Sequence, residues 1–240
     1  MNYAIIAAGE GSRLVQEGVA VPKPLVDLDG RPMIRRLIDI FASYKPETLS
    51  IIVNEQMTAV RAYIEEVAPS LPFDLRLTVK STPSSMHSFY EVSRGFTEGK
   101  FILTTVDTIF RQPDFMRYAE AFDRDDNADG CFGVTDFIDD EKPLYVDTDA
   151  DGFITAFRDA PNGSDRYISG GIYGLTTPAL DVLADCMERG VSRMRNYQRA
   201  LVDAGMRLRA FPFPKIVDVD HAGDIATARA FIAGECGSKL

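Results

Sequence analysis

Short apolar runs and amphipathic stretches alternate through the first half of the chain. Runs such as YAIIAA and SIIV are bounded by glycine or polar residues, as expected for buried strands. Four such strands are predicted, at residues 3–8, 48–54, 74–80 and 100–107. Apolar residues at helical spacing between and after them predict helices at residues 31–44, 57–68, 86–96 and 115–122. This order is typical of a mostly parallel sheet covered by helices on both faces.

The pattern changes after residue 122, where the strands become shorter and more frequent. Strands are predicted at residues 130–137, 143–148, 152–159, 168–175 and 207–213. Helices are predicted at residues 178–190, 192–205 and 221–235, the last of which closes the chain. No linker, repeat or low-complexity segment interrupts the sequence. We therefore predict a single domain spanning residues 1–240.

The composition excludes several classes of protein. Apolar residues make up 45% of the chain and the formal net charge is -10, which argues against the clustered lysines and arginines of a nucleic-acid-binding protein. No apolar run approaches the roughly 20 residues of a membrane helix, and the N-terminus lacks the basic region of a signal peptide. Cys131, Cys186 and Cys236 show no paired spacing, so we expect free thiols and a cytoplasmic protein with no membrane partner.

The segment AAGEGSRLVQEGVAVPKPL follows the first predicted strand and carries two glycines and two cations. Gly9 and Gly11 let backbone amides approach a ligand closely, and such a loop is suited to phosphate oxygens. Arg13 can bind phosphate in a forked geometry, while Lys23 supplies a compact charge. The segment is neither a dinucleotide fingerprint, because Leu14 stands where the third glycine belongs, nor a P-loop.

Two groups of carboxylates are candidate metal ligands. Asp107 follows the strand in TTVDTIF, at the carboxyl edge of the sheet where open α/β folds bind ligands. In KIVDVDHAGD, Asp218 and Asp220 alternate, so they share a face if the segment is extended. Asp224 suits the first turn of the last helix. Such carboxylates can hold Mg²⁺, which prefers oxygen ligands and often bridges phosphates.

These motifs together resemble a known family. AAGEGSRL followed by VPKPLVDLDGRPMI is similar to the signature of sugar-phosphate nucleotidyltransferases, and TTVD and DVDHAGD resemble their two metal-binding segments. ISGGIYGL resembles the strand that lines their sugar-phosphate pocket. The resemblance implies a three-layer α/β/α sandwich with a Rossmann-like, mostly parallel sheet of the glycosyltransferase-A type. It also implies a nucleotide-binding half, residues 1–112, and an acceptor-binding half with a closing helix, residues 113–240.

The resemblance implies roles for individual residues. Arg13, Lys23 and Asp107 are expected to be catalytic, with Arg13 on the leaving pyrophosphate and Lys23 on the α-phosphate. Mg²⁺ is expected on Asp107 and on Asp218, Asp220 or both. Nucleotide contacts are expected from Ala7, Ala8, Gly9, Glu10, Gly11, Ser12, Arg13 and Lys23, and acceptor contacts from Gly170 and Gly171.

The sequence also departs from the family pattern. The stretch ITAFRDAP has Ala160 where many members carry an acceptor-binding lysine, and Arg158 is the candidate to replace it. STPSSMHSFYEV lacks the usual Gly-Thr and looks more like cytidylyltransferases that use phosphocholine. Its Ser85, His87 and Ser88 are candidate nucleotide contacts, although a helix-surface role for His87 is equally well supported.

The leading hypothesis is a Mg²⁺-dependent nucleotidyltransferase that joins an NTP to a sugar 1-phosphate and releases pyrophosphate. The alternative acceptor is phosphocholine or a similar small phosphomonoester. A catalytically silent nucleotide-binding module and a glycosyltransferase are weaker alternatives, because the set of cations and carboxylates is intact and TTVD lacks a DxD motif. The expected partners are an NTP and a phosphorylated small molecule, and the oligomeric state, including a homo-oligomer, stays open.

Overall fold

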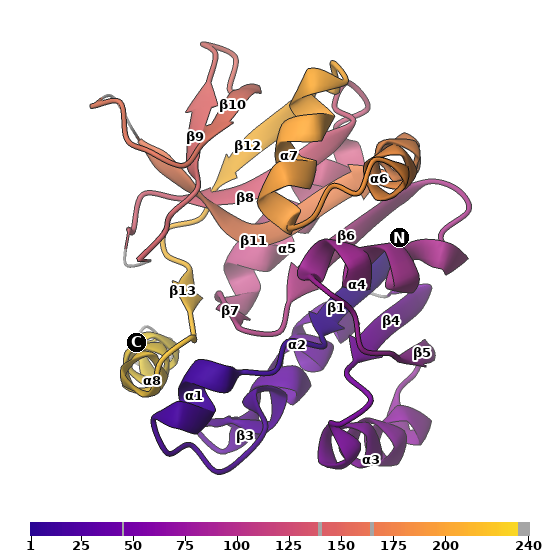
Figure 1. Cartoon of the computed structure of the whole chain (residues 1–240), viewed down its shortest axis with the longest axis vertical. Coiled ribbons are helices and arrows are strands. Elements are labelled where there is room, and N and C mark those ends of the chain that lie inside the picture. The colour runs from indigo at the N-terminus through magenta and orange to yellow at the C-terminus, as the bar shows by residue number, and fades with distance from the viewer. Residues whose placement is uncertain (45, 139–140, 164–165, 235–240) are drawn as a thin grey trace.

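The computed structural model describes residues 1–44, 46–138, 141–163 and 166–234. One sheet of nine strands runs through both halves of the chain (Figure 1). Its nine strands are β1 (Asn2–Ala7), β4 (Thr48–Val53), β5 (Asp74–Val79), β6 (Lys100–Thr105), β8 (Gly130–Thr135), β9 (Tyr145–Thr148), β10 (Ile154–Arg158), β11 (Tyr167–Thr176) and β12 (Leu208–Pro212). Each falls within a residue or two of a predicted strand.

The strand order along the sheet is β10-β9-β11-β6-β1-β4-β5, and β8 pairs with both β11 and β12. β6, β1, β4 and β5 are parallel, whereas β11 pairs antiparallel with β6. The carboxyl ends of the four parallel strands therefore meet at one edge of the sheet. This edge receives the loops that carry the predicted nucleotide contacts.

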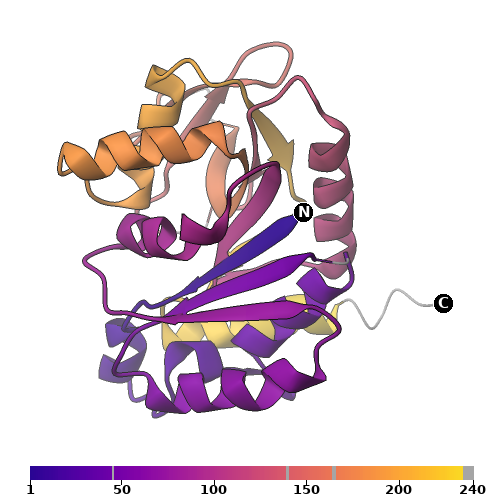
Figure 2. The same cartoon turned by 90° about the vertical axis from the view of Figure 1, so that its right-hand side faces the viewer.

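Successive side chains of β1 point into two separate cores, one on each face of the sheet. Tyr3 and Ile5 pack with α2 (Met33–Ala42), α3 (Thr58–Val67), α5 (Gln112–Arg124) and α8 (Ala222–Ala233). Ala4 and Ile6 pack on the other face with α4 (Ser85–Val92), α6 (Pro178–Glu188) and α7 (Met194–Asp203). Figure 2 shows helices on both faces of the sheet. The predicted three-layer α/β/α sandwich with a mostly parallel sheet is confirmed.

Several short elements were not predicted because they are too short to produce a periodic pattern. They are the helix α1 (Ser12–Gln16) and the two-residue strands β2 (Asp27–Leu28), β3 (Arg31–Pro32), β7 (Thr108–Ile109) and β13 (Val217–Asp218). β7 pairs antiparallel with β13, which ties the late acidic segment to the loop after β6. Within the described residues, every helix falls short of the length and apolarity needed to cross a bilayer.

Candidate active site

Gly11 makes the turn from the loop after β1 into α1. Its φ is 62°, in the left-handed region, and a Cβ at this position would lie 2.9 Å from Cβ of Lys23. Both the backbone angle and the close approach therefore require glycine. Lys23 begins a short 3-10 helix, Lys23–Leu25, in which Pro24 follows it. The turn thus packs the loop that carries Arg13 directly against Lys23.

The Lys23 ammonium lies between two carboxylates. Its Nζ is 2.6 Å from Oδ2 of Asp107 and 2.7 Å from Oδ1 of Asp220. Only 8% of the Lys23 side chain is exposed. Burial alone would lower the pKa of Lys23, but the charges of Asp107 and Asp220 outweigh it and the net pKa is raised. The lysine is therefore a fixed positive charge throughout the neutral pH range.

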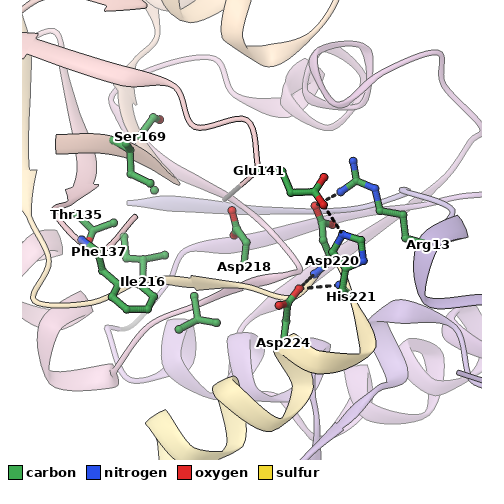
Figure 3. Close-up of a pocket in the computed structure, with 13 residues that line it drawn as sticks. Arg13, Thr135, Phe137, Glu141, Ser169, Ile216, Asp218, Asp220, His221 and Asp224 are labelled. Atoms are coloured by element: carbon green, nitrogen blue, oxygen red, sulfur yellow. Dashed lines mark hydrogen bonds and ion pairs between the residues drawn. The ribbon is translucent and has the colours of Figure 1, made fainter. Parts of the chain in front are cut away.

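Asp220 also binds Arg13, so two cations converge on one carboxylate. Nη1 of Arg13 donates to Oδ2 of Asp220 at 2.9 Å, and about half of each side chain is exposed. Figure 3 shows this pair, with Asp218 standing apart from it. The order of motifs in the sequence predicted that these residues would meet, although Arg13 and Asp220 are 207 positions apart.

The β7–β13 ladder explains how the late acidic segment reaches the end of β6. Asp218 pairs with Thr108 across the ladder, and the backbone N–H of Val219 donates to the carbonyl of Asp107 at 3.1 Å. Oγ1 of Thr108 donates to Oδ1 of Asp218 at 3.3 Å. Burial alone would raise the pKa of Asp107, but the Lys23 ammonium beside it brings the net pKa below its usual value. Asp107 is therefore ionised at neutral pH.

The N-terminus of α8 is attached to α1 through Glu17. Oε1 of Glu17 lies 2.6 Å from Nδ1 of His221, and Oε2 accepts from the backbone N–H of Ala222 at 2.6 Å. The hydrogen bond that the imidazole makes to the Glu17 carboxylate raises the pKa of His221. As expected, Asp224 lies in the first turn of α8, where it accepts from the backbone N–H groups of Asp220 and His221 (Figure 3). These contacts hold Asp220 beside the α1 loop.

A cleft of about 690 Å³ opens over the carboxyl ends of β1, β4, β5 and β6. Of the predicted nucleotide contacts, those that line it are Ala8, Gly9, Glu10, Gly11, Ser12, Arg13, Lys23, Ser85 and Ser88. Ala7 and His87 do not line the cleft. Ala7 is fully buried within β1. Nδ1 of His87 lies 2.8 Å from Oγ of Ser84. The volume is in the range of small-molecule and cofactor sites.

Sequence reasoning missed other residues that line this cleft, among them Asn54, Gln56 and Ser81. They follow β4 and β5 in turns that resemble ordinary polar loops. Only the parallel pairing of β4 with β1 and β5, which no local pattern reveals, brings them to the same edge.

A second cleft, of about 250 Å³, adjoins the first and shares Ser85, Thr105, Asp107 and Asp220 with it. Gly171, Asp218, Ser169, Tyr173, Gln198, Lys142, Arg193 and Arg195 also line it. Gly171 has φ 73°, and a Cβ there would lie 2.6 Å from Oγ1 of Thr108, so this position requires glycine. Gly170 lines a smaller neighbouring cavity with Asp218 and Asp220 (Figure 3).

Arg158 does not line either cleft. It lies on β10, where Nε and Nη2 donate to the two carboxylate oxygens of Asp147 at 2.7 and 2.8 Å. The cations on the second cleft are instead Lys142, Arg193 and Arg195. The last two lie in the SRMR stretch at the start of α7 (residues 192–195), which no motif in the sequence singled out.

Comparison with known sequences decides the family, because residues 3–160 match the profile of the MobA-like NTP transferase domain. The chain belongs to this family. It is a nucleotidyltransferase domain, and the resemblance found in its motifs is confirmed. The matched region contains the loop between β1 and α1, Lys23 and Asp107. It ends before β11 and before the segment that carries Asp218 and Asp220.

Curated relatives are longer than this chain. A mannose-1-phosphate guanyltransferase from Candida albicans is 27% identical over 198 residues, which cover 76% of this chain and 52% of that protein. The bifunctional protein GlmU of Methanococcus maripaludis is 21% identical over 249 residues, which cover 100% of this chain and 56% of that protein. This chain thus spans about half the length of these relatives.

Solved structures share the fold over the whole chain. The inositol-1-phosphate CTP transferase of T. maritima superposes with a TM-score of 0.81 at 19% identity, covering 100% of this chain and 97% of that one. A putative glucose-1-phosphate thymidylyltransferase from Bacillus anthracis superposes with a TM-score of 0.80 at 14% identity, covering 96% and 94%. At these identities the likeness establishes the fold.

Proposed function

We propose that this domain joins an NTP to a sugar 1-phosphate or a related polyol phosphate and releases pyrophosphate. One observation carries the proposal. The Lys23 ammonium, held within 2.7 Å of Asp107 and Asp220, lies where the two clefts meet. A nucleotide in the larger cleft and a phosphorylated acceptor in the smaller one would therefore bring their reacting groups to this cation.

The reaction requires positioning and neutralisation of charge. An oxygen of the acceptor phosphate attacks the α-phosphorus of the NTP, a new P–O bond forms, the bond to the bridging oxygen breaks, and pyrophosphate leaves. Because the acceptor phosphate is already an anionic nucleophile, no strong base is needed. Lys23 is suited to bind the α-phosphate, and Arg13, which is half exposed, is suited to bind the leaving pyrophosphate in a forked geometry.

Asp107 and Asp220 fit a Mg²⁺ site. Their oxygens already converge on one cationic nitrogen, and Mg²⁺ is commonly held by one or two carboxylates plus substrate phosphates. The carboxylate of Asp218 accepts a hydrogen bond from the hydroxyl of Thr108. Among the described residues, no three carboxylate, imidazole or thiol groups converge as a metal cluster. We therefore assign the ion to Asp107 and Asp220, where it would neutralise charge on the phosphates when bound.

The smaller cleft favours a sugar or polyol phosphate over phosphocholine. Lys142, Arg193 and Arg195 can attract a phosphate, and their charges balance those of Asp107, Asp218 and Asp220, which also line the cleft. Aromatic cages usually bind such groups, whereas Tyr173 is the only aromatic side chain among the described residues that line this cleft. Oγ of Ser169 donates to Oε1 of Gln198 at 2.9 Å, which provides polar groups for hydroxyls. The named relatives act on mannose 1-phosphate and inositol 1-phosphate.

The proposal is tested by measuring pyrophosphate release for each common NTP against a panel of sugar 1-phosphates, inositol 1-phosphate and phosphocholine, with and without Mg²⁺. We expect one sugar or polyol phosphate to support Mg²⁺-dependent release and phosphocholine to support little. Preferential release with phosphocholine would contradict the acceptor assignment. Nucleotide binding without release in any combination would favour a silent module.

Arg193 is expected to bind the acceptor phosphate. Its guanidinium has no partner among the described residues, and its backbone has φ 73°, which is unusual for a residue with a side chain. Arg193→Met should raise KM for the acceptor about 10-fold or more while KM for the NTP changes little, because a charge-assisted contact to phosphate is lost. Steady-state kinetics with each substrate varied in turn measure both constants.

Arg158→Met is the matched control. It removes the same charge from a side chain bound to Asp147 outside both clefts, so we expect KM for the acceptor to stay near the wild-type value. The opposite result would be a raised KM for the acceptor in the Arg158 variant and an unchanged KM in the Arg193 variant. It would restore the role that the sequence suggested for Arg158.

A further inference from the structure

Glu17 directly follows α1 and joins it to the start of α8, which lies beside α1 (Figure 1). Its Oε1 lies 2.6 Å from Nδ1 of His221, and its Oε2 accepts from the backbone N–H of Ala222 at 2.6 Å. The hydrogen bond from Ala222 lowers the pKa of Glu17, so the carboxylate is charged at neutral pH. Because the N-terminus of a helix carries partial positive charge, it stabilises a carboxylate in this position. One side chain therefore holds both the imidazole and the backbone at the first turn of α8.

Among the described residues, four polar contacts join α1 and the residues up to Lys23 to the segment 220–222. Two of them end on the carboxylate of Asp220, which Arg13 contacts at 2.9 Å and Lys23 at 2.7 Å. The other two are made by Glu17. The two sets differ in place, because Arg13 and Lys23 line the nucleotide cleft and Glu17 lines neither cleft.

Substrate binding would change the first set of contacts and leave the second. In the proposed reaction Arg13 and Lys23 bind phosphates while Asp220 binds Mg²⁺, so these groups exchange their ion pairs for contacts with the substrate. Glu17 lies outside both clefts, where no substrate group competes for its oxygens. Of the four polar contacts, the two made by Glu17 are therefore the ones that persist when NTP is bound.

We infer that Glu17 positions Asp220 for Mg²⁺ by tethering the start of α8 to α1 while the substrate is bound. Glu17 contacts neither substrate nor ion, so it is a positioning residue. Removing a group that orients a metal ligand commonly lowers metal affinity about 10- to 100-fold, even though the group never meets the ion. The inference rests on the proposed function, because it takes Asp220 as a metal ligand and the larger cleft as the NTP site.

Glu17→Ala tests the inference because it removes both contacts at once. We expect the free Mg²⁺ concentration that gives half of the full increase in NTP affinity to rise about 10- to 100-fold. The affinity for NTP in EDTA, without any divalent cation, should change much less. Isothermal titration calorimetry at a series of Mg²⁺ concentrations measures both quantities. The ligand is whichever of ATP, CTP, GTP, UTP and dTTP the wild-type protein binds most tightly.

Glu17→Gln should keep most of the wild-type Mg²⁺ response at slightly alkaline pH. The glutamine oxygen can accept from Ala222, and its nitrogen can donate to Nδ1 of a neutral His221 imidazole. Glu65→Ala is the matched control, because Glu65 is an exposed glutamate of α3 that pairs with Arg61 and lines neither cleft. We expect its Mg²⁺ requirement to stay within about twofold of wild type. Thermal melting of each variant near the wild-type temperature shows that the fold persists.

A double variant separates action through Asp220 from a general structural role. Added to Asp220→Asn, Glu17→Ala should raise the Mg²⁺ requirement by less than about twofold more, since the group that it positions is already changed. The inference would be overturned by a full additional loss in this background, by a wild-type Mg²⁺ requirement in Glu17→Ala, or by equal losses of NTP affinity with and without Mg²⁺. A glutamine variant as impaired as the alanine variant would also overturn it.

The readout is equilibrium binding and needs no acceptor. Failure to detect pyrophosphate release with any acceptor would therefore count against the proposed reaction. A raised Mg²⁺ requirement for NTP binding in Glu17→Ala, kept near wild type in Glu17→Gln, would still support the role of Glu17.

Discussion

Lys23→Met is expected to lower kcat about 1,000-fold, the upper part of the range seen when a single charge-stabilising donor is removed. Lys23 is the most buried cation of the site, with 8% of its side chain exposed, and no other described cation contacts both Asp107 and Asp220. The charge that develops at the α-phosphate would lose its neutralising partner. The substitution also removes the cation that lowers the pKa of Asp107. Pyrophosphate release under saturating substrates measures the change in kcat.

Lys80→Met is a suitable control because Lys80 pairs with Glu91 and does not line the cleft. We expect its kcat to stay within about twofold of wild type, as for most surface changes. The same loss in both variants would indicate a general effect of charge. A Lys23 variant with near-normal kcat and an intact fold would contradict the assignment of this lysine.

Asp107→Asn is expected to lower kcat about 100- to 1,000-fold and to raise the Mg²⁺ concentration needed for half-maximal activity. Asparagine keeps the size of the side chain but loses the charge that a divalent cation requires. Asp220→Asn should act in the same direction, because its carboxylate shares Lys23 with Asp107. Titrating Mg²⁺ at fixed substrate concentrations, at a pH well above the lowered pKa of Asp107, measures both effects.

Asp218→Asn separates the two acidic positions of the DVD segment. Asp218 accepts from Thr108 and lies apart from the Arg13–Asp220 pair, so we expect a much smaller change in the Mg²⁺ requirement (Figure 3). If Asp218→Asn raised the Mg²⁺ requirement as much as Asp107→Asn did, and Asp220→Asn raised it little, the metal ligand would be Asp218 and not Asp220.

Most of the fold could be predicted because its main elements are long enough to show their periodicity. β1 contains the apolar run YAIIA and β4 contains the run IIV, and α2 and α3 each extend over ten residues. β7 and β13 could not be predicted, because two residues carry no periodic pattern and their pairing joins positions 110 apart. That small ladder nevertheless decides how Asp218 and Asp220 are placed.

The donor side of the site was easier to predict than the acceptor side. Arg13, Lys23 and Asp107 lie in motifs whose order in the sequence is distinctive, and the structure brings all three together. Arg158 was suggested by its place near the position of the family's acceptor-binding lysine, but in the β9–β10 hairpin its guanidinium pairs with Asp147. Arg193 reaches the smaller cleft from the N-terminus of α7, a placement that no short motif encodes.

Transfer of a labelled phosphorus tests the central claim most directly, namely that nucleotidyl transfer takes place where the two clefts meet. The NTP would carry its label on the α-phosphorus, and the products would be separated after reaction with the preferred acceptor. We predict that the label appears in the nucleotide-linked acceptor, with one unlabelled pyrophosphate released for each label transferred, and that Lys23→Met loses both products together. Label recovered as a nucleoside diphosphate, with the γ-phosphate on the acceptor, would show a kinase reaction and contradict the account.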